Sequence, residues 1–267
     1  NQEIKFRLFL DTARERGADL IATGHYAQTG GTCAEDGSAA TNQEHSFQPD
    51  RLYRATDAAK DQTYFLYRVT SDALQHTLFP LGGYTKQQVR HMASERGLWT
   101  ARKQESMGVC FVGNVGMRDF LSQYISTRPG DIIDKQTGAV LGQHDGAIFY
   151  TLGQRHGLDV GGGLPYYVVG KDMAANVVYV SRNMNDEAMW RHDVLVGDLH
   201  WIHGAPAASD QLTVRLRHRG QLRPCTLQYD SAQAQATLHL SDPERAVAAG
   251  QSAVIYRGTE CLGGGIV

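Results

Sequence analysis

Apolar residues recur at helical spacing where the chain begins. Ile4, Leu8 and Phe9 fall on one face of a helix, so the pattern predicts an amphipathic helix over residues 1–16. A short apolar run at 18–23 follows and predicts a buried strand. One helix followed by one strand is typical of an α/β sheet, and we expect the first part of the chain to belong to that class.

More elements of the same kind are predicted in the next stretch. We expect a strand over 52–55, a short helix over 70–78 and a strand-like segment over 98–101. Thr85 is a favourable capping residue, and it predicts the start of a helix over 86–96.

The pattern changes to short strands and turns after Phe120. A hairpin is predicted over 129–142, and the strict alternation over 212–219 predicts a strand. The runs 250–256 and 261–267 are interpreted as closing strands of a barrel. The second half is therefore predicted to be β-rich and to end in a β-barrel.

The composition places the chain among soluble globular proteins. Of its 267 residues, 42% are apolar and 20% are charged, and the formal net charge is −2. No overall basic excess indicates nucleic acid, so any RNA contact must come from local patches. With no signal peptide and no apolar run of membrane-spanning length, we expect a cytoplasmic protein that has no membrane partner.

The four cysteines, Cys33, Cys110, Cys225 and Cys261, lie far apart in the sequence. Their spacing matches no zinc site, and we expect no structural metal. Cys33 falls in the polar stretch 29–49, which contains almost no apolar residue and predicts an exposed loop. In a reducing compartment these residues are expected to be free thiols.

Cys110 lies in an unusual segment. Arg102 and Lys103 precede it closely, and Gly108 lets the backbone bend toward a partner. Because nearby cations favour the thiolate, Cys110 is a candidate sulfur nucleophile or sulfur carrier. The alternative is a buried structural cysteine, which composition alone favours.

Two polar segments of the α/β part are candidate binding residues. Gly24 and His25 directly follow the strand predicted over 18–23, where ligands of open α/β sheets gather, although a plain strand-ending turn would fit as well. Lys60, Asp61 and Gln62 could bind phosphate and hydrogen-bond a base or ribose. A helix start capped by Asp61 is the alternative.

Two segments of the β-rich half carry positive charge. The run 150–158 and the glycines after it suit phosphate or ribose contact, but also a purely structural connection. In the strand predicted over 212–219, Arg215, Arg217 and Arg219 would project from one face. That row could bind phosphate or could simply face water.

Six segments together resemble the tRNA-specific 2-thiouridylases, and the resemblance extends over the whole chain. They are Asn1-Gln2-Glu3-Ile4-Lys5-Phe6, Ala22-Thr23-Gly24-His25-Tyr26, Lys60-Asp61-Gln62 with Tyr64-Phe65-Leu66, Ser106-Met107-Gly108-Val109-Cys110-Phe111, Thr151-Leu152-Gly153-Gln154-Arg155, and Cys261-Leu262-Gly263-Gly264-Gly265.

The resemblance implies an enzyme that activates the C2 carbonyl of the wobble uridine with ATP and magnesium and replaces its oxygen with sulfur. Cys110 matches the persulfide-carrying cysteine, and Gly24 matches a nucleotide-contacting glycine. The family takes its sulfur from a relay protein or a cysteine desulfurase. The positions implied to contact tRNA are His25, Lys60, Asp61, Gln62, Arg217, His218 and Gln251.

The implied fold is the carboxy-terminal part of an adenine nucleotide α-hydrolase-like (ATP pyrophosphatase) domain over 1–115. A central tRNA-binding β-rich module follows over 116–188, and a β-barrel over 189–267. The family's phosphate-cradling loop and its partner cysteine, expected just before Asn1, do not occur in the sequence. We therefore expect a fragment that lacks about a hundred family residues and is inactive alone.

The sequence departs from the family pattern at two further positions, and two other functions are compatible with parts of it. Glu105 and Met107 stand where the family usually has Asp and Thr, which leaves the interpretation of Cys110 unchanged. The second hypothesis is a nonenzymatic RNA-binding remnant. An amide-forming ATP pyrophosphatase is disfavoured, because such enzymes need no carrier thiol.

Overall fold

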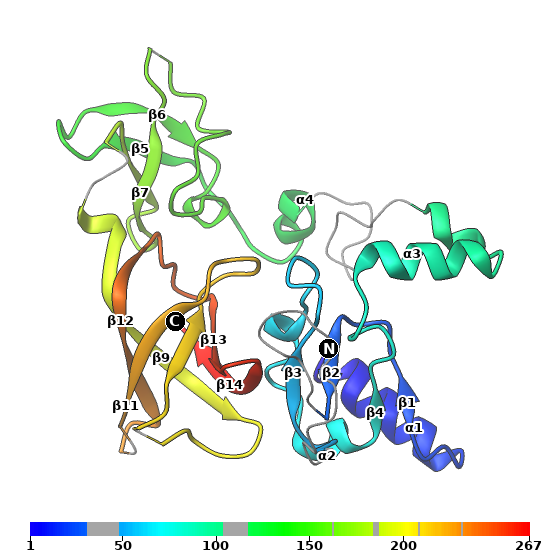
Figure 1. The fold of residues 1–267 in the computed structure, drawn as a ribbon. Helices are drawn as coiled ribbons and strands as arrows, with labels where there is room; N and C mark the ends of the chain where they lie inside the picture. Colours follow the sequence, from blue (N-terminus) through cyan, green and yellow to red (C-terminus); the bar gives the residue numbers. More distant parts are fainter. Residues whose placement is uncertain (31–47, 104–116, 162, 184–186, 208, 231) are drawn as a thin grey trace. The chain divides into compact units, whose positions relative to one another are not determined.

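The computed structural model describes residues 1–30, 48–103, 117–161, 163–183, 187–207, 209–230 and 232–267 (Figure 1). The chain divides into two compact units. The first combines Asn1–Lys103 with His192–Asp242 and Ala249–Val267, and the second combines Gln104–Arg191 with Pro243–Ala248. The α/β part and most of the carboxy-terminal strands therefore share one unit. The domain boundaries 1–115, 116–188 and 189–267 stay a prediction.

The first unit begins with the predicted helix and strand. A π-helical segment, Ile4–Phe9, continues into helix α1, Leu10–Glu15, and strand β1, Ile21–Ala22, follows. Strand β1 pairs in parallel with β4, Thr77–Leu78, which comes after the short helix α2, Ser71–Gln75. Parallel pairing of strands with helices between them confirms the α/β class.

Helix α3, Lys86–Glu95, begins at its predicted cap. The Thr85 hydroxyl accepts a hydrogen bond from the Gln88 N–H at 3.3 Å, and Gln88 Oε1 accepts one from the Thr85 N–H at 2.7 Å. The strand-like segment predicted over 98–101 was wrong. A 3-10 turn, Trp99–Arg102, occupies that place, because the backbone forms local hydrogen bonds there.

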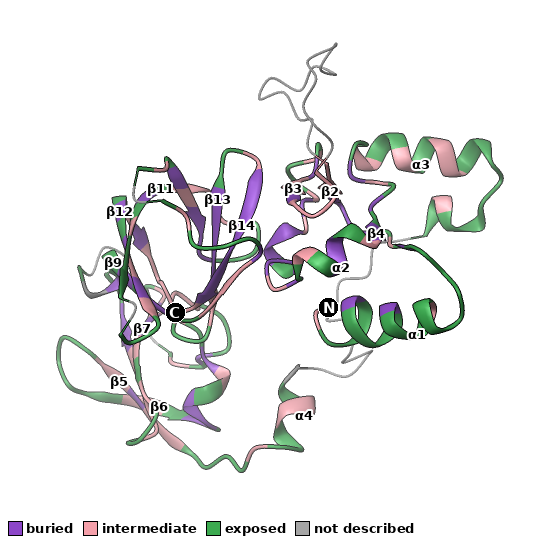
Figure 2. Ribbon diagram, turned by 90° about the horizontal axis from the view of Figure 1, so that it is seen from below, coloured by how far each residue is buried: buried purple, intermediate pink, exposed green. Residues whose placement is uncertain are grey.

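Six strands of the carboxy-terminal part close into a barrel, as predicted. They are β9 (Trp190–Trp201), β10 (Leu212–Arg215), β11 (Arg223–Asp230), β12 (Gln235–Arg245), β13 (Ser252–Arg257) and β14 (Glu260–Ile266). Neighbours run β13-β10-β11-β12-β9-β14, and β14 pairs back with β13. Closure removes the open edges of the ring, and Figure 2 shows buried residues along its strands.

Consecutive glycines let β14 lie close to its neighbours. A Cβ atom on Gly263 would clash with the carbonyl oxygen of His200, and one on Gly264 with that of Ala253. The φ angles of these two glycines, +137° and +156°, are also values that other residues rarely adopt. Backbone packing therefore explains the glycine run of this segment.

A hairpin of the α/β part extends the barrel sheet. Strand β2, Ala27–Thr29, pairs with β3, Leu52–Arg54, where the sequence predicted a strand. Strand β3 then pairs with the start of β14, with Tyr53 opposite Glu260. The α/β part and the barrel thus share one hydrogen-bonded sheet.

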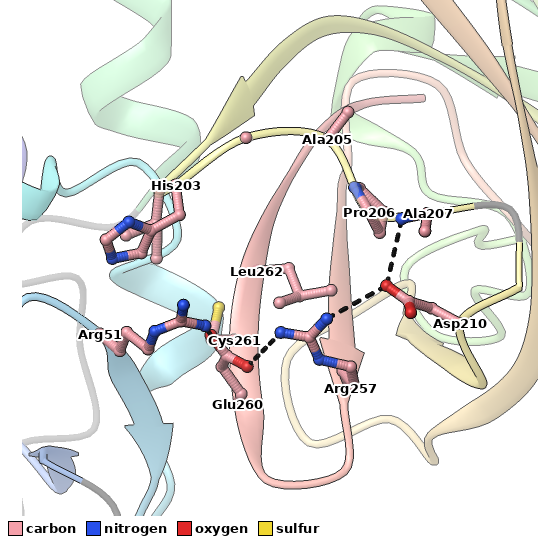
Figure 3. A pocket seen from close by; sticks show the side chains of 12 residues that line it. Arg51, His203, Ala205, Pro206, Ala207, Asp210, Arg257, Glu260, Cys261 and Leu262 are labelled. Carbon is pink, nitrogen blue, oxygen red and sulfur yellow. Dashed lines mark hydrogen bonds and ion pairs between the residues drawn. The ribbon is translucent and has the colours of Figure 1, made fainter. Parts of the chain in front are cut away.

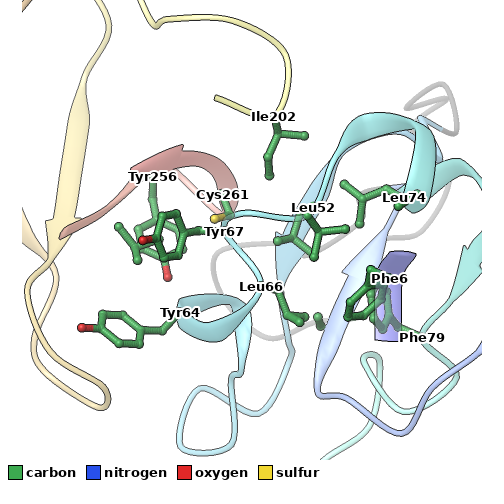
Figure 4. Close-up of a cluster of buried hydrophobic side chains, with 14 of the residues drawn as sticks. Phe6, Leu52, Tyr64, Leu66, Tyr67, Leu74, Phe79, Ile202, Tyr256 and Cys261 are labelled. Carbon is green, nitrogen blue, oxygen red and sulfur yellow. The ribbon is translucent and has the colours of Figure 1, made fainter. Parts of the chain in front are cut away.

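One apolar core serves both parts of the first unit. The cluster includes Phe6 of the amino-terminal helix, Leu52 and Leu66 from the hairpin region, and Tyr256 and Cys261 of the barrel (Figure 4). All five are buried. Removing this shared surface from water holds the two parts together.

The second unit contains a four-stranded sheet. Its strands, in the order β6-β5-β8-β7, are Val140–His144, Gly130–Asp134, Val177–Ser181 and Tyr167–Asp172, and helix α4, Met117–Ser122, precedes them in sequence. The hairpin predicted over 129–142 is confirmed as β5 and β6. Ile132, Val168 and Val178 are fully buried and form the centre of its core.

A buried ion pair joins the α/β part to the barrel. Arg215, the last residue of β10, places Nη1 2.8 Å from Asp61 Oδ2, and the Asp61 side chain is fully buried. The Thr63 hydroxyl lies 3.0 Å from both carboxylate oxygens, and it also lies 3.1 Å from the Tyr256 hydroxyl. A buried carboxylate needs such a paired and hydrogen-bonded environment.

The predicted row of three arginines is not formed. Strand β10 ends at Arg215, whose side chain is buried against Asp61, whereas Arg217 and Arg219 lie exposed in the turn that follows. The Gly220 N–H donates to the Arg217 carbonyl at 2.9 Å, and this turn ends the alternation predicted over 212–219.

The ion pair gives the first prediction. Arg215→Met should lower the free energy of unfolding by about 3–5 kcal/mol, because the buried carboxylate loses its 2.8 Å partner and keeps only Arg54, whose Nε lies 3.8 Å from Asp61 Oδ2. The double variant Asp61→Asn/Arg215→Met removes both charges and should lose much less. Denaturant unfolding of both variants measures the difference. A cost below about 1 kcal/mol for Arg215→Met, as for exposed pairs, would contradict a structural role.

Candidate functional site

The carboxyl ends of β1 and β4 form the edge where a nucleotide is predicted to bind. Gly24 lies two residues after the end of β1 and is exposed. A Cβ atom added there would meet only Leu81 Cδ1 at 3.8 Å, which is an ordinary contact. Gly24 therefore borders open space, as a nucleotide-contacting residue requires. Its contact with a nucleotide stays a prediction.

His25 is buried rather than presented to solvent. Its side chain is packed near Phe6 and Phe79, and the residue is 8% exposed. Nδ1 lies 2.8 Å from Thr23 Oγ1, and Nε2 lies 3.4 Å from Lys5 Nζ. Burial, followed by the Lys5 charge, lowers the pKa of His25 to about 4. The ring is therefore neutral at pH 7, and a direct contact with tRNA requires it to be uncovered.

The Lys60-Asp61-Gln62 segment contacts both the turn after β1 and the barrel. Gln62 Oε1 accepts from the Tyr26 N–H at 2.9 Å, and the Gln62 N–H donates to the Tyr26 carbonyl at 2.9 Å. Asp61 is 2% exposed and engaged with Arg215, so the structure does not support a direct tRNA contact by its carboxylate. Lys60 is partly exposed at the surface.

A cationic hollow of about 410 Å³ opens beside Lys60. Its charged lining comes from Lys60 in the α/β part and from Arg215 and Arg219 in the barrel part. Arg215 is paired there with Asp61. A concave surface lined by three cationic side chains suits a phosphate group.

The turn after β10 carries the other predicted contact residues of the barrel. Arg217 and His218 are both exposed there. Gln251 is elsewhere on the barrel, just before β13, and its carbonyl accepts from the Val267 N–H at 2.9 Å. His218 lies in the chain between Arg215 and Arg219, which both line the hollow. The tRNA contacts of Arg217, His218 and Gln251 stay predictions.

The sequence did not single out Phe65 as a binding residue. Its ring centroid lies 4.4 Å from that of His218, and 48% of the residue is exposed. In the sequence it belongs to the apolar run Tyr64-Phe65-Leu66, which gives no sign that the middle residue faces solvent. The pairing of Arg215 with Asp61 was also missed, because these residues are far apart in the chain.

A second hollow, of about 250 Å³, has a different character. Arg257 Nη2 lies 2.8 Å from Glu260 Oε2, and Arg257 Nη1 lies 3.2 Å from Asp210 Oδ2 (Figure 3). Arg51 also pairs with Glu260. Both of its arginines are paired with carboxylates, which weakens the attraction of this hollow for a phosphate.

The motif around Gln154 has a structural role in the second unit. Gln154 Oε1 accepts from the Thr151 N–H at 3.0 Å, and its Nε2–H donates to the His156 carbonyl at 2.8 Å. Gly153 and Gly157 have φ angles of +81° and +73°. These contacts stabilise the turns of the segment 150–158 and account for its glycines.

Two of the four cysteines are poor nucleophiles. Burial raises the pKa of Cys225 to about 12, and burial also raises the pKa of the fully buried Cys261. Neither thiol is accessible to a sulfur donor. Cys110 and Cys33 lie outside the described residues, so the interpretation of Cys110 stays a prediction.

Within the described ranges, no group of three or more His, Cys, Asp or Glu side chains could hold a metal ion. The described part of the chain also contains no helix with the length and apolar character needed to cross a membrane.

Three family models match the chain in succession. Residues 1–114 match the tRNA methyl transferase HUP domain, residues 118–182 the tRNA methyl transferase PRC-barrel domain, and residues 191–267 the aminomethyltransferase beta-barrel domain. Together they cover nearly the whole sequence.

Curated relatives match the chain from end to end. The tRNA-specific 2-thiouridylase MnmA of Ralstonia pickettii is 44% identical over 273 residues, which cover 100% of this chain and 70% of that protein. Its counterpart in Levilactobacillus brevis is 41% identical over 273 residues, covering 100% and 69%. The protein of the same name from Stenotrophomonas maltophilia is 40% identical over 274 residues, covering 100% and 68%.

The burial of His25 predicts a pH dependence. Its folded-state pKa of about 4 lies below the ordinary 6.5, so protonation favours the unfolded chain. Its contribution to stability is complete above about pH 6.5 and is lost as the pH falls toward 4. The slope from this one group approaches about 1.4 kcal/mol per pH unit.

His25→Gln should remove that part of the pH dependence. Denaturant unfolding of the wild type and the variant, at pH values across this window, gives the difference between their slopes. Parallel curves for the two proteins would show that His25 is protonated as readily in the folded state as in the unfolded chain.

Proposed function

The chain belongs to the family of tRNA-specific 2-thiouridylases, and we propose that it carries the sulfur-delivering and tRNA-docking parts of an ATP-dependent tRNA-uridine 2-sulfurtransferase. The observation that carries this proposal is the match of relatives about 40% identical over the whole chain. The substrate would be the wobble uridine of tRNA, and the product its 2-thio form.

Cys110 is proposed as the sulfur carrier. Arg102 and Lys103 lie a few residues before it in the sequence, and cations close to a thiol favour the reactive thiolate. The burial of Cys225 and Cys261 supports this choice, because their raised pKa values leave them protonated at neutral pH. Cys33 lies in a polar stretch that lacks neighbouring basic residues.

The proposed reaction transfers one sulfur atom from Cys110 to the uridine. The outer sulfur of a Cys110 persulfide forms a bond to C2 of the uridine, and the C2–O bond breaks. A second thiol then attacks the Cys110 sulfur, so that a disulfide forms and the transferred sulfur stays on the base. The persulfide itself would come from a sulfur-relay protein or a cysteine desulfurase in the cytoplasm.

ATP with magnesium is proposed to turn the C2 oxygen into a leaving group. The open edge beside Gly24, at the carboxyl ends of β1 and β4, supports a nucleotide position there. Gln62 would hold this edge in place through its two hydrogen bonds to Tyr26. None of the described residues forms a loop of the phosphate-cradling kind.

tRNA docking is proposed to involve both parts of the first unit. Lys60, Arg217 and His218 would contact the RNA directly, and Gln251 would contact it at another point of the barrel. Asp61 would act from the interior, by fixing Arg215 beside the hollow. The three cationic side chains that line that hollow support a phosphate contact.

The test of the carrier is Cys110→Ser in the protein as its gene encodes it. The variant should form no 2-thiouridine, because a hydroxyl cannot hold persulfide sulfur, yet it should bind tRNA as the wild type does. Cys225→Ala is the matched control and should keep thiolation. Nucleoside mass spectrometry of the tRNA and a binding titration measure the two properties.

The possible outcomes separate the candidate functions. Thiouridine formation by Cys110→Ser would overturn the carrier assignment. Tight tRNA binding by a wild-type protein that forms no thiouridine, with donor and ATP supplied, would favour the nonenzymatic RNA-binding function instead.

A further inference from the structure

An aromatic pair lies at the surface of the first unit. Phe65 is 48% exposed, although Tyr64 and Leu66 on either side of it are buried. Its ring contacts His218 at a centroid distance of 4.4 Å and an interplanar angle of 42°, and Tyr64 meets it edge-on at 5.5 Å. An exposed ring held by two others offers a fixed apolar face at low entropic cost.

His218 connects this pair with the cationic hollow. Arg215 and Arg219, which precede and follow it in the chain, both line that hollow. After burial, their charges are the main causes that lower the pKa of His218. The imidazole is therefore neutral at pH 7, and it adds ring surface rather than a further charge.

Arg219 adopts a backbone conformation that disfavours long side chains. Its φ is +60°, and the Gly220 N–H donates to the Arg217 carbonyl at 2.9 Å across the turn. This is the turn position at which glycine is usual. The Arg219 side chain is exposed at this turn and lines the cationic hollow.

Arg215 is the fixed cation of the lining. It is 5% exposed, paired with Asp61 at 2.8 Å, and its guanidinium lies 5.5 Å from the ring centre of Tyr256. Its buried Nε–H has no hydrogen-bond partner among the described residues. The buried Nε–H is out of reach of a ligand, so Arg215 acts on an anion in the hollow through the charge of its fixed guanidinium.

We propose that this surface binds one unpaired nucleotide of tRNA, whose base stacks on Phe65 beside His218 and whose phosphate lies in the hollow of Lys60, Arg215 and Arg219. The inference rests on the proposed function, because it takes tRNA as the ligand. Aromatic stacking beside a cationic groove is how proteins bind single-stranded nucleic acid. A base-paired duplex presents no free base face, so the surface selects unpaired nucleotides.

The experiment compares Phe65→Leu and Phe65→Tyr in the protein as its gene encodes it. Binding of an unmodified tRNA and of a blunt RNA duplex is measured at several salt concentrations. Phe65→Leu should weaken tRNA binding about fivefold or more at every salt concentration, because it loses the aromatic face. Phe65→Tyr keeps that face and should bind within about twofold of the wild type.

The arginines of the turn give the contrasting result. Arg217→Ala/Arg219→Ala should flatten the salt dependence, by about one in slope for each lost phosphate contact, whereas Phe65→Leu should leave the slope unchanged. Duplex binding should respond to the arginines and not to Phe65. Thermal unfolding checks each variant, and Phe65→Met replaces Phe65→Leu if the latter is destabilised.

Two failures are distinguishable. If the wild type binds tRNA but Phe65→Leu binds it equally well, or loses duplex binding to the same extent, the stacking site is wrong and the proposed function stands. If the wild type does not bind tRNA at all, the proposed function fails together with the site.

Discussion

The Asp61 carboxylate lies in the interior of the first unit, 2.8 Å from Arg215 and 3.0 Å from the Thr63 hydroxyl. Asp61 comes from the α/β part and Arg215 from the barrel, so the pair forms only when these two parts are docked. Within the α/β part Asp61 has only the more distant Arg54, at 3.8 Å, so burying the carboxylate without Arg215 would cost free energy, which favours this docking. The pairing of β3 with β14 and the shared apolar core also hold the two parts together.

The two residues on either side of Asp61, Lys60 and Gln62, lie at the two proposed binding regions. Gln62 fixes the turn after β1, where a nucleotide is expected, while Lys60 joins Arg215 and Arg219 around the cationic hollow. One tripeptide therefore contacts both the edge where a nucleotide is expected and the cationic hollow proposed to bind phosphate. Such a connection suits an enzyme that must hold an activated base and its tRNA in one register.

Much of the fold could be predicted from local pattern. The cap at Thr85 and the alternation near 212–215 correspond to elements of the structure. A helix also forms near the start of the chain, but its predicted apolar face was wrong: Ile4, Leu8 and Phe9 are exposed, and the helix packs through Phe6 and Leu10. The segment 98–101 was misjudged, because a short apolar run fits a turn as well as a strand. The predicted row of three arginines was wrong for a related reason: the alternation does not show that the strand ends at Arg215.

The site was harder to predict, because it depends on contacts between distant residues. Motifs identified the Lys60-Asp61-Gln62 segment, but not that Asp61 would be buried against a barrel arginine 154 positions away. Exposure of Phe65 within an apolar run is likewise decided by tertiary packing. Local sequence shows the charge and the spacing of side chains. Which side chains are buried, and which residues they contact, is decided by tertiary packing.

The central claim is that sulfur travels through a single thiol, and one measurement tests it directly. The protein is incubated with cysteine and a cysteine desulfurase, alkylated, digested, and analysed by mass spectrometry for an added sulfur atom on each cysteine-containing peptide. We expect the added sulfur atom on the peptide that contains Cys110, and on neither the Cys225 peptide nor the Cys261 peptide. An unmodified Cys110, or sulfur carried by another cysteine instead, would contradict it.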